Sequence, residues 1–264
     1  MKLGFIGTGN MAGAIIGGII KTGLIPPEEI IGSDISAPGR EHMQNIYGIY
    51  VTPDNRKVAE RAEVIFLCVK PQYYSTVIAE IKHVISNRQL VISIAPGKTL
   101  GWLEEHFGKP VKLVRTMPNT PAMVSQGMTA VCPNDCVSKE ELEYVVSILK
   151  TIGETEVIPE NLIDAVVAVS GSSPAYVFIM IEAMADAAVA EGMPRAQAYK
   201  FAAQAVYGSA KMVLETGRHP GELKDMVCSP AGTTIEAVRV LEKKGFRSAL
   251  IESMKACAEV SRNL

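Results

Sequence analysis

Short apolar runs alternate with longer mixed segments through the first half of the chain. The runs are rich in Val, Ile, Leu and Phe and predict buried strands at 3–6, 30–33, 64–69, 90–94 and 113–115. Between them, apolar residues at helical spacing predict helices at 11–21, 40–47, 55–61, 73–81 and 100–106. A strand near 128–132, a helix at 139–150 and a last strand at 154–157 follow. This alternation predicts a doubly wound parallel sheet that helices cover on both faces.

The pattern changes after Pro159, where strand-like alternation stops. Several helical stretches follow, and segments that contain Gly or Pro separate them at 171–174, 192–194, 217–221 and 229–232. We therefore expect an α/β chain of two domains. The doubly wound domain comprises residues 1–159, and an all-helical domain comprises residues 160–264.

The helical half is unusually apolar. Residues 164–191 contain no Lys or Arg, and the predicted helices are apolar nearly all round. Such helices usually bury their excess apolar surface against a partner. The run 174–190 is long enough to raise the question of a membrane span, but Glu182 and Asp186 interrupt it, and charges are costly at a bilayer centre. We expect a helical dimerisation domain and no membrane segment.

A glycine motif, Gly7-x-Gly9-x-x-Ala12, stands between the first strand and the first helix. Gly7 can take backbone angles closed to other residues, and Gly9 has no side chain to keep a pyrophosphate away. The free N–H groups and the helix dipole then face the phosphates. An ordinary strand–helix turn is the alternative, but this context favours a Rossmann-type dinucleotide site. The expected binding residues here are Ile6, Gly7, Thr8, Gly9, Asn10 and Met11.

The end of the second strand carries the residues that choose between NAD and NADP. Asp34 stands where an acid would hold the ribose 2′-hydroxyl of NAD, and its charge would repel a 2′-phosphate. Ser33, Ser36 and Arg40 surround it, and an Arg with hydroxyls is how a 2′-phosphate is accommodated. The sequence is therefore compatible with either NAD or NADP. Alternatively, Asp34 has no role in cofactor binding and caps a helix that starts near Pro38.

Three further loops follow strand ends, where ligands bind in open α/β sheets. Lys70 could contact a phosphate or ribose, or it could be a solvated loop lysine. The two prolines of 115–121 make a stiff loop in which Asn119 and Thr120 offer hydrogen bonds to a nicotinamide carboxamide; the alternative is a rigid turn. The expected cofactor residues from these loops are Val69, Lys70, Pro71, Ala95, Gly97, Met117 and Asn119.

Composition narrows the classes of function. A formal charge of −2 and the lack of a Lys/Arg cluster argue against a nucleic-acid surface. The chain has five cysteines, an odd number, and reduced thiols in the cytoplasm are the simplest interpretation. Cys132 and Cys136 have no second Cys pair or nearby His to complete a tetrahedral set, so we expect no metal site.

Two segments of the helical half open helices with small polar residues. In the first, 170–176, Pro174 is expected as the first helical residue. In the second, 225–234, Ser229 fits an N-cap, and the small residues leave first-turn N–H groups accessible, while Thr233 and Thr234 add hydroxyls. Such a helix start can bind a small carboxylate, although a simple helix cap is the alternative.

These motifs together resemble the pyrroline-5-carboxylate reductase family, in register from the first strand to the last helix. The departures are small: Ala231 and Ser173 stand where the family often has glycine. Asp34 matters more, because the family generally uses NADPH readily. The segments that carry the resemblance are 4–9, 69–71, 117–121, 171–176, 223–225 and, most specifically, 229–234.

The resemblance implies reduction of 1-pyrroline-5-carboxylate to L-proline by NADPH or NADH, the last step of proline biosynthesis. It implies a homodimer interlocked through the helical domain, and often a higher ring of dimers such as a decamer. Asn55 matches a position near the adenosine part of the cofactor, and the 117–121 loop would lie near the nicotinamide. The implied substrate-binding residues are Ser229, Gly232, Thr233, Thr234 and Asn119.

Imine reduction needs little from side chains, because a protonated cyclic imine accepts hydride readily once it is positioned. The four histidines are scattered, so the Thr234 hydroxyl is the candidate catalytic group that donates or orients the proton. A 3-hydroxyacid dehydrogenase would need a lysine on a helix early in the second domain, and no Lys lies between Lys150 and Lys200. A non-catalytic dinucleotide sensor would not need the anion site at 229–234.

Overall fold

The computed structural model describes residues 2–263, which divide into two compact units. The first unit comprises the chain up to Gly171 together with the segment from Cys257, and the second comprises Ser172–Ala256. The predicted boundary at residue 159 rests on the change in sequence character and stays a prediction.

The described part of the first unit contains one eight-stranded sheet with the order β3-β2-β1-β4-β5-β6-β7-β8. Neighbouring strands are parallel except for β6 and β7, which are antiparallel. The order reverses between β1 and β4, and in such sheets ligands bind at this point, beyond the carboxyl ends of the strands. The strands are β1 (Leu3–Ile6), β2 (Ile30–Ser33), β3 (Tyr50–Thr52), β4 (Val64–Leu67), β5 (Leu90–Ser93), β6 (Lys112–Met117), β7 (Gly127–Pro133) and β8 (Gly153–Val157).

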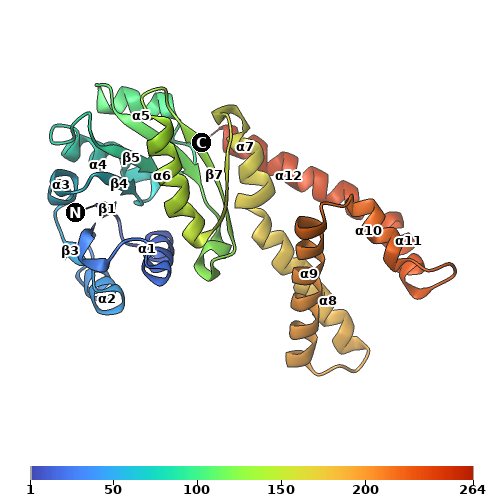
Figure 1. Ribbon diagram of the computed structural model, residues 1–264. Helices are drawn as coiled ribbons and strands as arrows, with labels where there is room; N and C mark the ends of the chain where they lie inside the picture. The colour runs from blue at the N-terminus through green and yellow to red at the C-terminus, as the bar shows by residue number, and fades with distance from the viewer. Residues whose placement is uncertain (1, 264) are drawn as a thin grey trace. The chain divides into compact units, whose positions relative to one another are not determined.

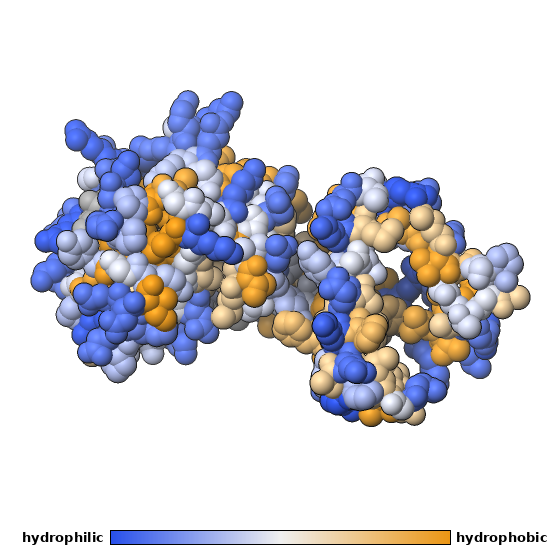
Figure 2. All heavy atoms as spheres, turned by 60° about the horizontal axis from the view of Figure 1, so that its bottom comes forward, coloured by the Kyte–Doolittle hydropathy of each residue, from blue (hydrophilic) through white to orange (hydrophobic). Residues whose placement is uncertain are grey.

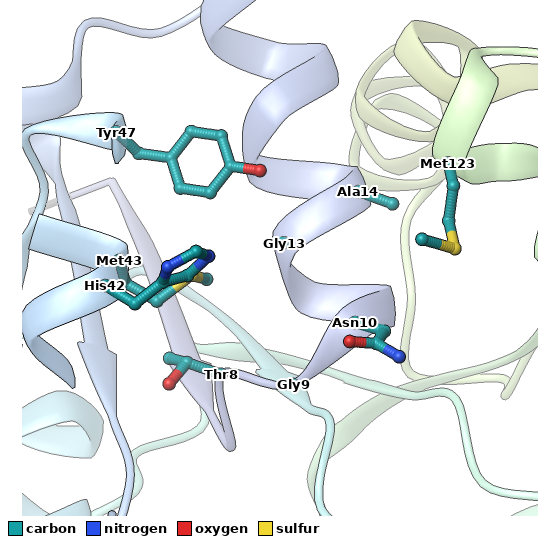
Figure 3. A pocket seen from close by; sticks show the side chains of 9 residues that line it. All are labelled: Thr8, Gly9, Asn10, Gly13, Ala14, His42, Met43, Tyr47 and Met123. Atoms are coloured by element: carbon teal, nitrogen blue, oxygen red, sulfur yellow. The ribbon is translucent and has the colours of Figure 1, made fainter. Parts of the chain in front are cut away.

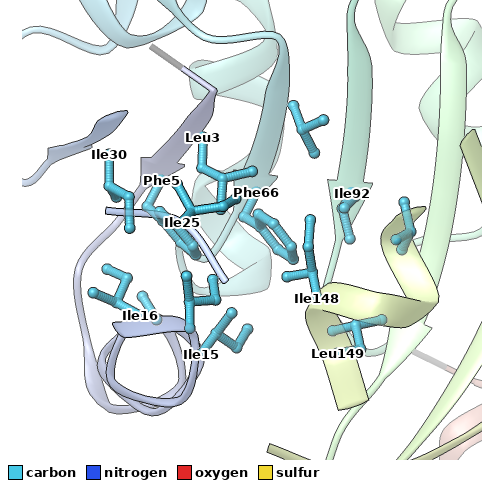
Figure 4. Packing of buried hydrophobic residues seen from close by; sticks show 14 of the residues in the cluster. Leu3, Phe5, Ile15, Ile16, Ile25, Ile30, Phe66, Ile92, Ile148 and Leu149 are labelled. Carbon is cyan, nitrogen blue, oxygen red and sulfur yellow. The ribbon is translucent and has the colours of Figure 1, made fainter. Parts of the chain in front are cut away.

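Helices cover both faces of this sheet (Figure 1). One core joins the sheet to α1, α2 and α6, with the rings of Phe5 and Phe66 stacked 4.8 Å apart at its centre (Figure 4). A second core joins the other face to α3, α4 and α5. These helices are α1 (Asn10–Thr22), α2 (Ala37–Tyr47), α3 (Asn55–Arg61), α4 (Tyr74–Ile81), α5 (Leu100–Phe107) and α6 (Lys139–Leu149).

The doubly wound sheet predicted from the sequence is confirmed, with differences at its edges. β3 was not predicted; it has three residues, of which Thr52 alone is buried, so its apolar pattern is too short to read. β4 and β5 end at Leu67 and Ser93, earlier than expected, and the residues after them form loops. β7 runs antiparallel to β6, a reversal that a single apolar run does not encode.

The first unit also contains the short helix α7 (Ile163–Val166), a π-helical turn at Val167–Gly171 and the end of α12 (Phe246–Arg262). The Ser261 hydroxyl donates a 2.6 Å hydrogen bond to Asp164, which ties the chain's last helix to α7. Arg115 on β6 is buried and pairs with Glu160 at 2.8 Å, just before α7.

The second unit consists of helices, of which α8 (Ser173–Ala190) and α9 (Arg195–Thr216) pack together as a hairpin. Gly192 turns the chain between them with φ +93°, a conformation that favours glycine. α10 (Pro220–Val227), α11 (Thr233–Lys243) and the first part of α12 complete the unit.

The apolar residues of α8 and α9 are largely exposed in the single chain. Among the described residues of α8, only Ala185 is fully buried, whereas Phe178, Ile179 and Phe201 are each more than 60% exposed. Figure 2 shows apolar side chains, in orange and tan, gathered on the surface of the helical part. Within the described chain, residues 160–190 form one helical stretch apolar enough to cross a membrane, which by itself is weak evidence for a span.

Candidate functional site

The β1–α1 turn has the backbone geometry that a pyrophosphate site requires. Gly7 has φ +88°, and a Cβ added there would lie 2.9 Å from the backbone of Cys68 and Val69. Gly9 is the N-cap of α1 and gives no side-chain cap, so the first-turn N–H groups stay available. A Cβ at Gly9 would meet no protein atom within 4 Å, so the space above it is open to a ligand.

A cavity of about 380 Å³ lies beside this turn, where the strand order reverses. It brings together seven of the predicted cofactor residues from four segments of the chain. Two others, Thr8 and Asn10, line a neighbouring cavity, and Ile6 is fully buried in β1. The predicted residues that line the larger cavity are Gly7, Gly9, Ser33, Asp34, Asn55, Val69 and Lys70.

Asp34 faces the glycine turn. Its Oδ2 accepts hydrogen bonds from the Thr8 N–H at 2.9 Å and the Thr8 hydroxyl at 3.2 Å, and its Oδ1 accepts from the Ser36 N–H at 2.9 Å. Ser36, not Asp34, caps α2 by accepting from Gly39 N–H. Arg40 donates to the backbone oxygen of Asp34 at 2.6 Å. The helix-cap alternative for Asp34 is therefore wrong, and its carboxylate is fixed at the edge of the cavity.

Ser33 and Asn55 belong to a second hydrogen-bonded group in the same cavity. The Ser33 hydroxyl donates to Asn55 Oδ1 at 2.7 Å, and Asn55 Nδ2 donates to Glu80 Oε2 on α4 at 2.7 Å. Glu80 lines the cavity with Thr76 and Val77 of the same helix. Glu80 was not predicted from the sequence, because nothing in a helix pattern marks an acid that faces a cavity.

The neighbouring cavity, of about 250 Å³, is lined mainly by the start of α1 and by α2 (Figure 3). It shares Thr8 and Gly9 with the larger cavity, and His42 and Tyr47 enter it from α2. His42 was not predicted as a site residue, because the four histidines are scattered along the sequence.

Buried hydroxyl groups connect the three strand ends under the remaining cofactor loops. The Tyr74 hydroxyl donates to the Leu67 carbonyl at 2.6 Å and accepts from the Ser93 hydroxyl at 3.2 Å. The Thr116 hydroxyl donates to the Ser93 carbonyl at 3.0 Å. Burial raises the pKa of Tyr74 well above its ordinary value, so this hydroxyl remains a donor at neutral pH. The network fixes the ends of β4 and β5, after which Lys70 and Ala95 follow, and the end of β6, of which Met117 is the last residue.

The side chain of Asn119 forms hydrogen bonds within the first unit. Its Nδ2 donates to the Ser170 carbonyl at 3.0 Å, and its Oδ1 accepts from the Met128 N–H at 2.9 Å. Met117 ends beside Gly171, where an added Cβ would lie 3.1 Å from the Met117 methyl. Nδ2 carries two protons and one of them goes to Ser170, so a hydrogen bond from the second proton to a ligand stays a prediction.

The thiols of Cys132, which is buried, and Cys68, which is half-buried, are poor nucleophiles. Burial raises the pKa of Cys132 to about 11, partly offset by the nearby Arg115 guanidinium, and burial raises the pKa of Cys68 still further above its ordinary value. Among the described residues, no group of three or more His, Cys, Asp or Glu side chains could hold a metal ion.

The start of α11 differs from the prediction in one detail. Its N-cap is Gly232, not Ser229, and no side chain caps the first turn. The chain approaches through Ala231 with φ +57°, and Gly232 N–H donates to the Ser229 carbonyl at 3.0 Å. A Cβ at Gly232 would lie 2.2 Å from Ser229 Oγ, so a larger residue here would require the Ser229 side chain to rotate away. The result is a helix start with free N–H groups beside the Thr233 and Thr234 hydroxyls, suited to a carboxylate.

Comparisons with known proteins cover the whole chain. A family model described as "NADP oxidoreductase coenzyme F420-dependent" matches residues 2–97, and one described as "Pyrroline-5-carboxylate reductase dimerisation" matches residues 160–264. The pyrroline-5-carboxylate reductase of Escherichia coli (strain K12) is 56% identical over 263 residues, which are 100% of this chain and 98% of that protein.

Two solved structures are similar over nearly their full length. A pyrroline-5-carboxylate reductase from Coxiella burnetii aligns with a TM-score of 0.93 at 36% identity, over 99% of this chain and 97% of that one. The Plasmodium falciparum pyrroline carboxylate reductase with NADP bound aligns with a TM-score of 0.90 at 32% identity, over 100% and 97% of the two chains.

Proposed function

Because the chain belongs to the pyrroline-5-carboxylate reductase family, we propose that it reduces 1-pyrroline-5-carboxylate to L-proline with a nicotinamide dinucleotide. This membership confirms the resemblance that the sequence motifs indicated. One observation carries the proposal: the likeness extends over the entire chain, so both the turn at Gly9 and the helix start at Thr233 belong to the shared region.

The first unit fits the dinucleotide. The N–H groups at the start of α1 would hold the pyrophosphate, with Gly9 leaving room for it. Ser33, Asp34 and Asn55 would face the adenosine ribose from the ends of β2 and the start of α3. When bound, the dinucleotide supplies a hydride to the imine carbon.

The start of α11 would hold the substrate carboxylate. Its first-turn N–H groups carry the positive end of the helix dipole, and Ser229, Thr233 and Thr234 supply hydroxyls around it. The Thr234 hydroxyl would orient or protonate the imine nitrogen, which makes the ring carbon a better hydride acceptor. Asn119 remains a candidate substrate contact through its loop.

The finer choice between NADPH and NADH depends on the ribose end of the cavity. Asp34 places a fixed carboxylate there, which opposes a 2′-phosphate. Arg40 lies close enough to bond the Asp34 carbonyl, and its guanidinium is the nearby group that would offset a phosphate charge. We propose that the enzyme accepts both cofactors and that Asp34 sets the ratio.

A spectrophotometric assay tests the proposal. Purified protein should oxidise NADPH or NADH only when 1-pyrroline-5-carboxylate is added, and L-proline should accumulate in equal amount. A 3-hydroxyacid in place of the imine, with oxidised cofactor, should give no turnover. If neither cofactor is oxidised between mildly acidic and neutral pH, while the cofactor still binds, a dinucleotide sensor becomes the better description.

We place this activity in the cytoplasm.

A further inference from the structure

Glu80 stands out among the residues of the larger cavity, because no family motif described above includes it. It comes from α4, and its carboxylate bonds a side chain rather than a backbone group. Because Asn55 is expected near the adenosine, the partner of Glu80 is itself a candidate cofactor residue.

The bond to Glu80 decides which way the Asn55 amide faces. In the observed orientation, Oδ1 accepts from the Ser33 hydroxyl and Nδ2 donates to the Glu80 carboxylate. A flipped amide would set its carbonyl oxygen against a carboxylate, two acceptors without a proton between them. The negative charge of Glu80 therefore excludes the flipped state.

The fixed orientation determines what the cavity offers to a ligand. Nδ2 carries two protons, and one of them goes to Glu80, which leaves the second for a ligand. The start of α3 is itself held, since Asp54 caps it by accepting from the Arg56 N–H at 2.9 Å. Asn55 thus presents a donor from a rigid helix start, and a donor suits both a ribose hydroxyl oxygen and a phosphate oxygen.

We propose that Glu80 is a positioning residue for the cofactor, which acts by holding the Asn55 amide with its N–H group available to the ribose end of the dinucleotide. This inference rests on the proposed function of the cavity as the dinucleotide site. A direct role of the Glu80 charge is the competing explanation, and the two differ in sign. Loss of positioning weakens NADH and NADPH alike, whereas loss of a repelling charge strengthens NADPH and leaves NADH unchanged.

The test measures cofactor affinity without turnover, by titrating the nucleotide fluorescence of NADH and of NADPH separately. For Glu80→Ala we expect the Kd of both to rise about three- to tenfold, the scale of one lost hydrogen bond. Glu80→Gln keeps the shape but tolerates either amide orientation, so its Kd should lie between wild type and Glu80→Ala. In the turnover assay, the cofactor KM should rise while kcat stays near wild type.

A double-mutant cycle separates positioning from a general structural effect. In an Asn55→Ala background, Glu80→Ala should raise the Kd by less than about twofold, because the group it positions is gone. Glu60→Ala, an exposed acid on α3, is the matched control and should leave both Kd values unchanged. A full additional loss in the Asn55→Ala background, or tighter NADPH binding in Glu80→Ala, would overturn the inference. Since binding is read directly, absence of imine reduction would reject the proposed function without affecting this result.

Discussion

At the scale of single residues, the proposed ribose end of the cavity is held by hydrogen bonds. Asp34 uses both carboxylate oxygens on Thr8 and Ser36, and its position therefore depends on the glycine turn itself. A carboxylate placed in this way accepts readily from a ribose hydroxyl but meets a phosphate as a like charge.

Replacing Asp34 with Ser should therefore favour NADPH. Removing one negative charge beside the 2′ position should raise the ratio of kcat/KM for NADPH to that for NADH on the order of tenfold. Glu41→Gln removes an exposed charge from α2 and should leave the ratio unchanged. An unaltered ratio in Asp34→Ser would mean that its carboxylate does not reach the ribose.

The Thr234 hydroxyl should act in the transition state. Thr234→Val keeps the branched shape and should preserve α11, while kcat falls by roughly one to three orders of magnitude if the hydroxyl orients or protonates the imine nitrogen. Steady-state kinetics with saturating cofactor give the answer, with Thr216→Val at the end of α9 as the control. A raised KM with intact kcat would instead assign Thr234 to binding of the carboxylate.

At the scale of elements, the two glycines of the β1–α1 turn have different tasks. Gly7 is required by the fold, because a Cβ there would press on the backbone after β4. Gly9 is free of such contacts and has φ −77°, which any residue adopts. Its value lies in the space that it leaves for a ligand.

This difference gives a paired prediction. Gly9→Ala should leave the melting temperature within about one degree, since surface-like changes without strain cost little, yet raise the cofactor Kd tenfold or more on the scale of a lost phosphate contact. Gly7→Ala should lower the melting temperature by several degrees, roughly 1–3 kcal/mol for a strained backbone. Calorimetry and fluorescence titration of both variants decide it, and an equal loss of stability in the two would contradict the assignment.

The sequence predicts those parts of the structure that local pattern encodes. The strand β1, the turn at Gly7 and the sheet class follow from apolar periodicity and from glycine spacing. Glu80 and Tyr74 could not be found in this way, because their importance comes from partners far away in sequence, Asn55 for Glu80 and Ser93 for Tyr74. Ser229 was wrongly expected as the N-cap of α11, because Ser is a good capping residue. The N-cap in the structure is Gly232, three positions later, after a tight turn.

At the scale of the whole molecule, the helical unit is incomplete as a single chain. Its α8 helix buries little, and the matching dimerisation domain accounts for the apolar residues that remain exposed. The prediction of a partner from the apolar run 164–191, which contains no Lys or Arg, is thereby confirmed. The number of subunits beyond two is the open part of that prediction.

Light scattering at micromolar concentration should give at least the mass of a dimer, and it distinguishes a dimer from the decamer that the family resemblance implies. Ile179→Glu should shift the protein toward monomer, because it places a charge on an apolar face of α8 that is 66% exposed in the single chain. Ile46→Glu, at an isoleucine of α2 that is 58% exposed, serves as the control and should keep the wild-type mass. A monomer for the unmodified protein would refute the role of α8.

The exposed faces of α8 and α9 also make the protein sensitive to dilution. When a folded helical unit needs a second copy to cover it, unfolding separates two chains, and mass action enters the equilibrium. Each tenfold dilution then lowers the free energy of unfolding by about 1.4 kcal/mol per dimer. Melting temperatures measured at different concentrations should therefore form a series rather than a single value, and assays at very low enzyme concentration would sample a less stable protein than the one in concentrated stocks.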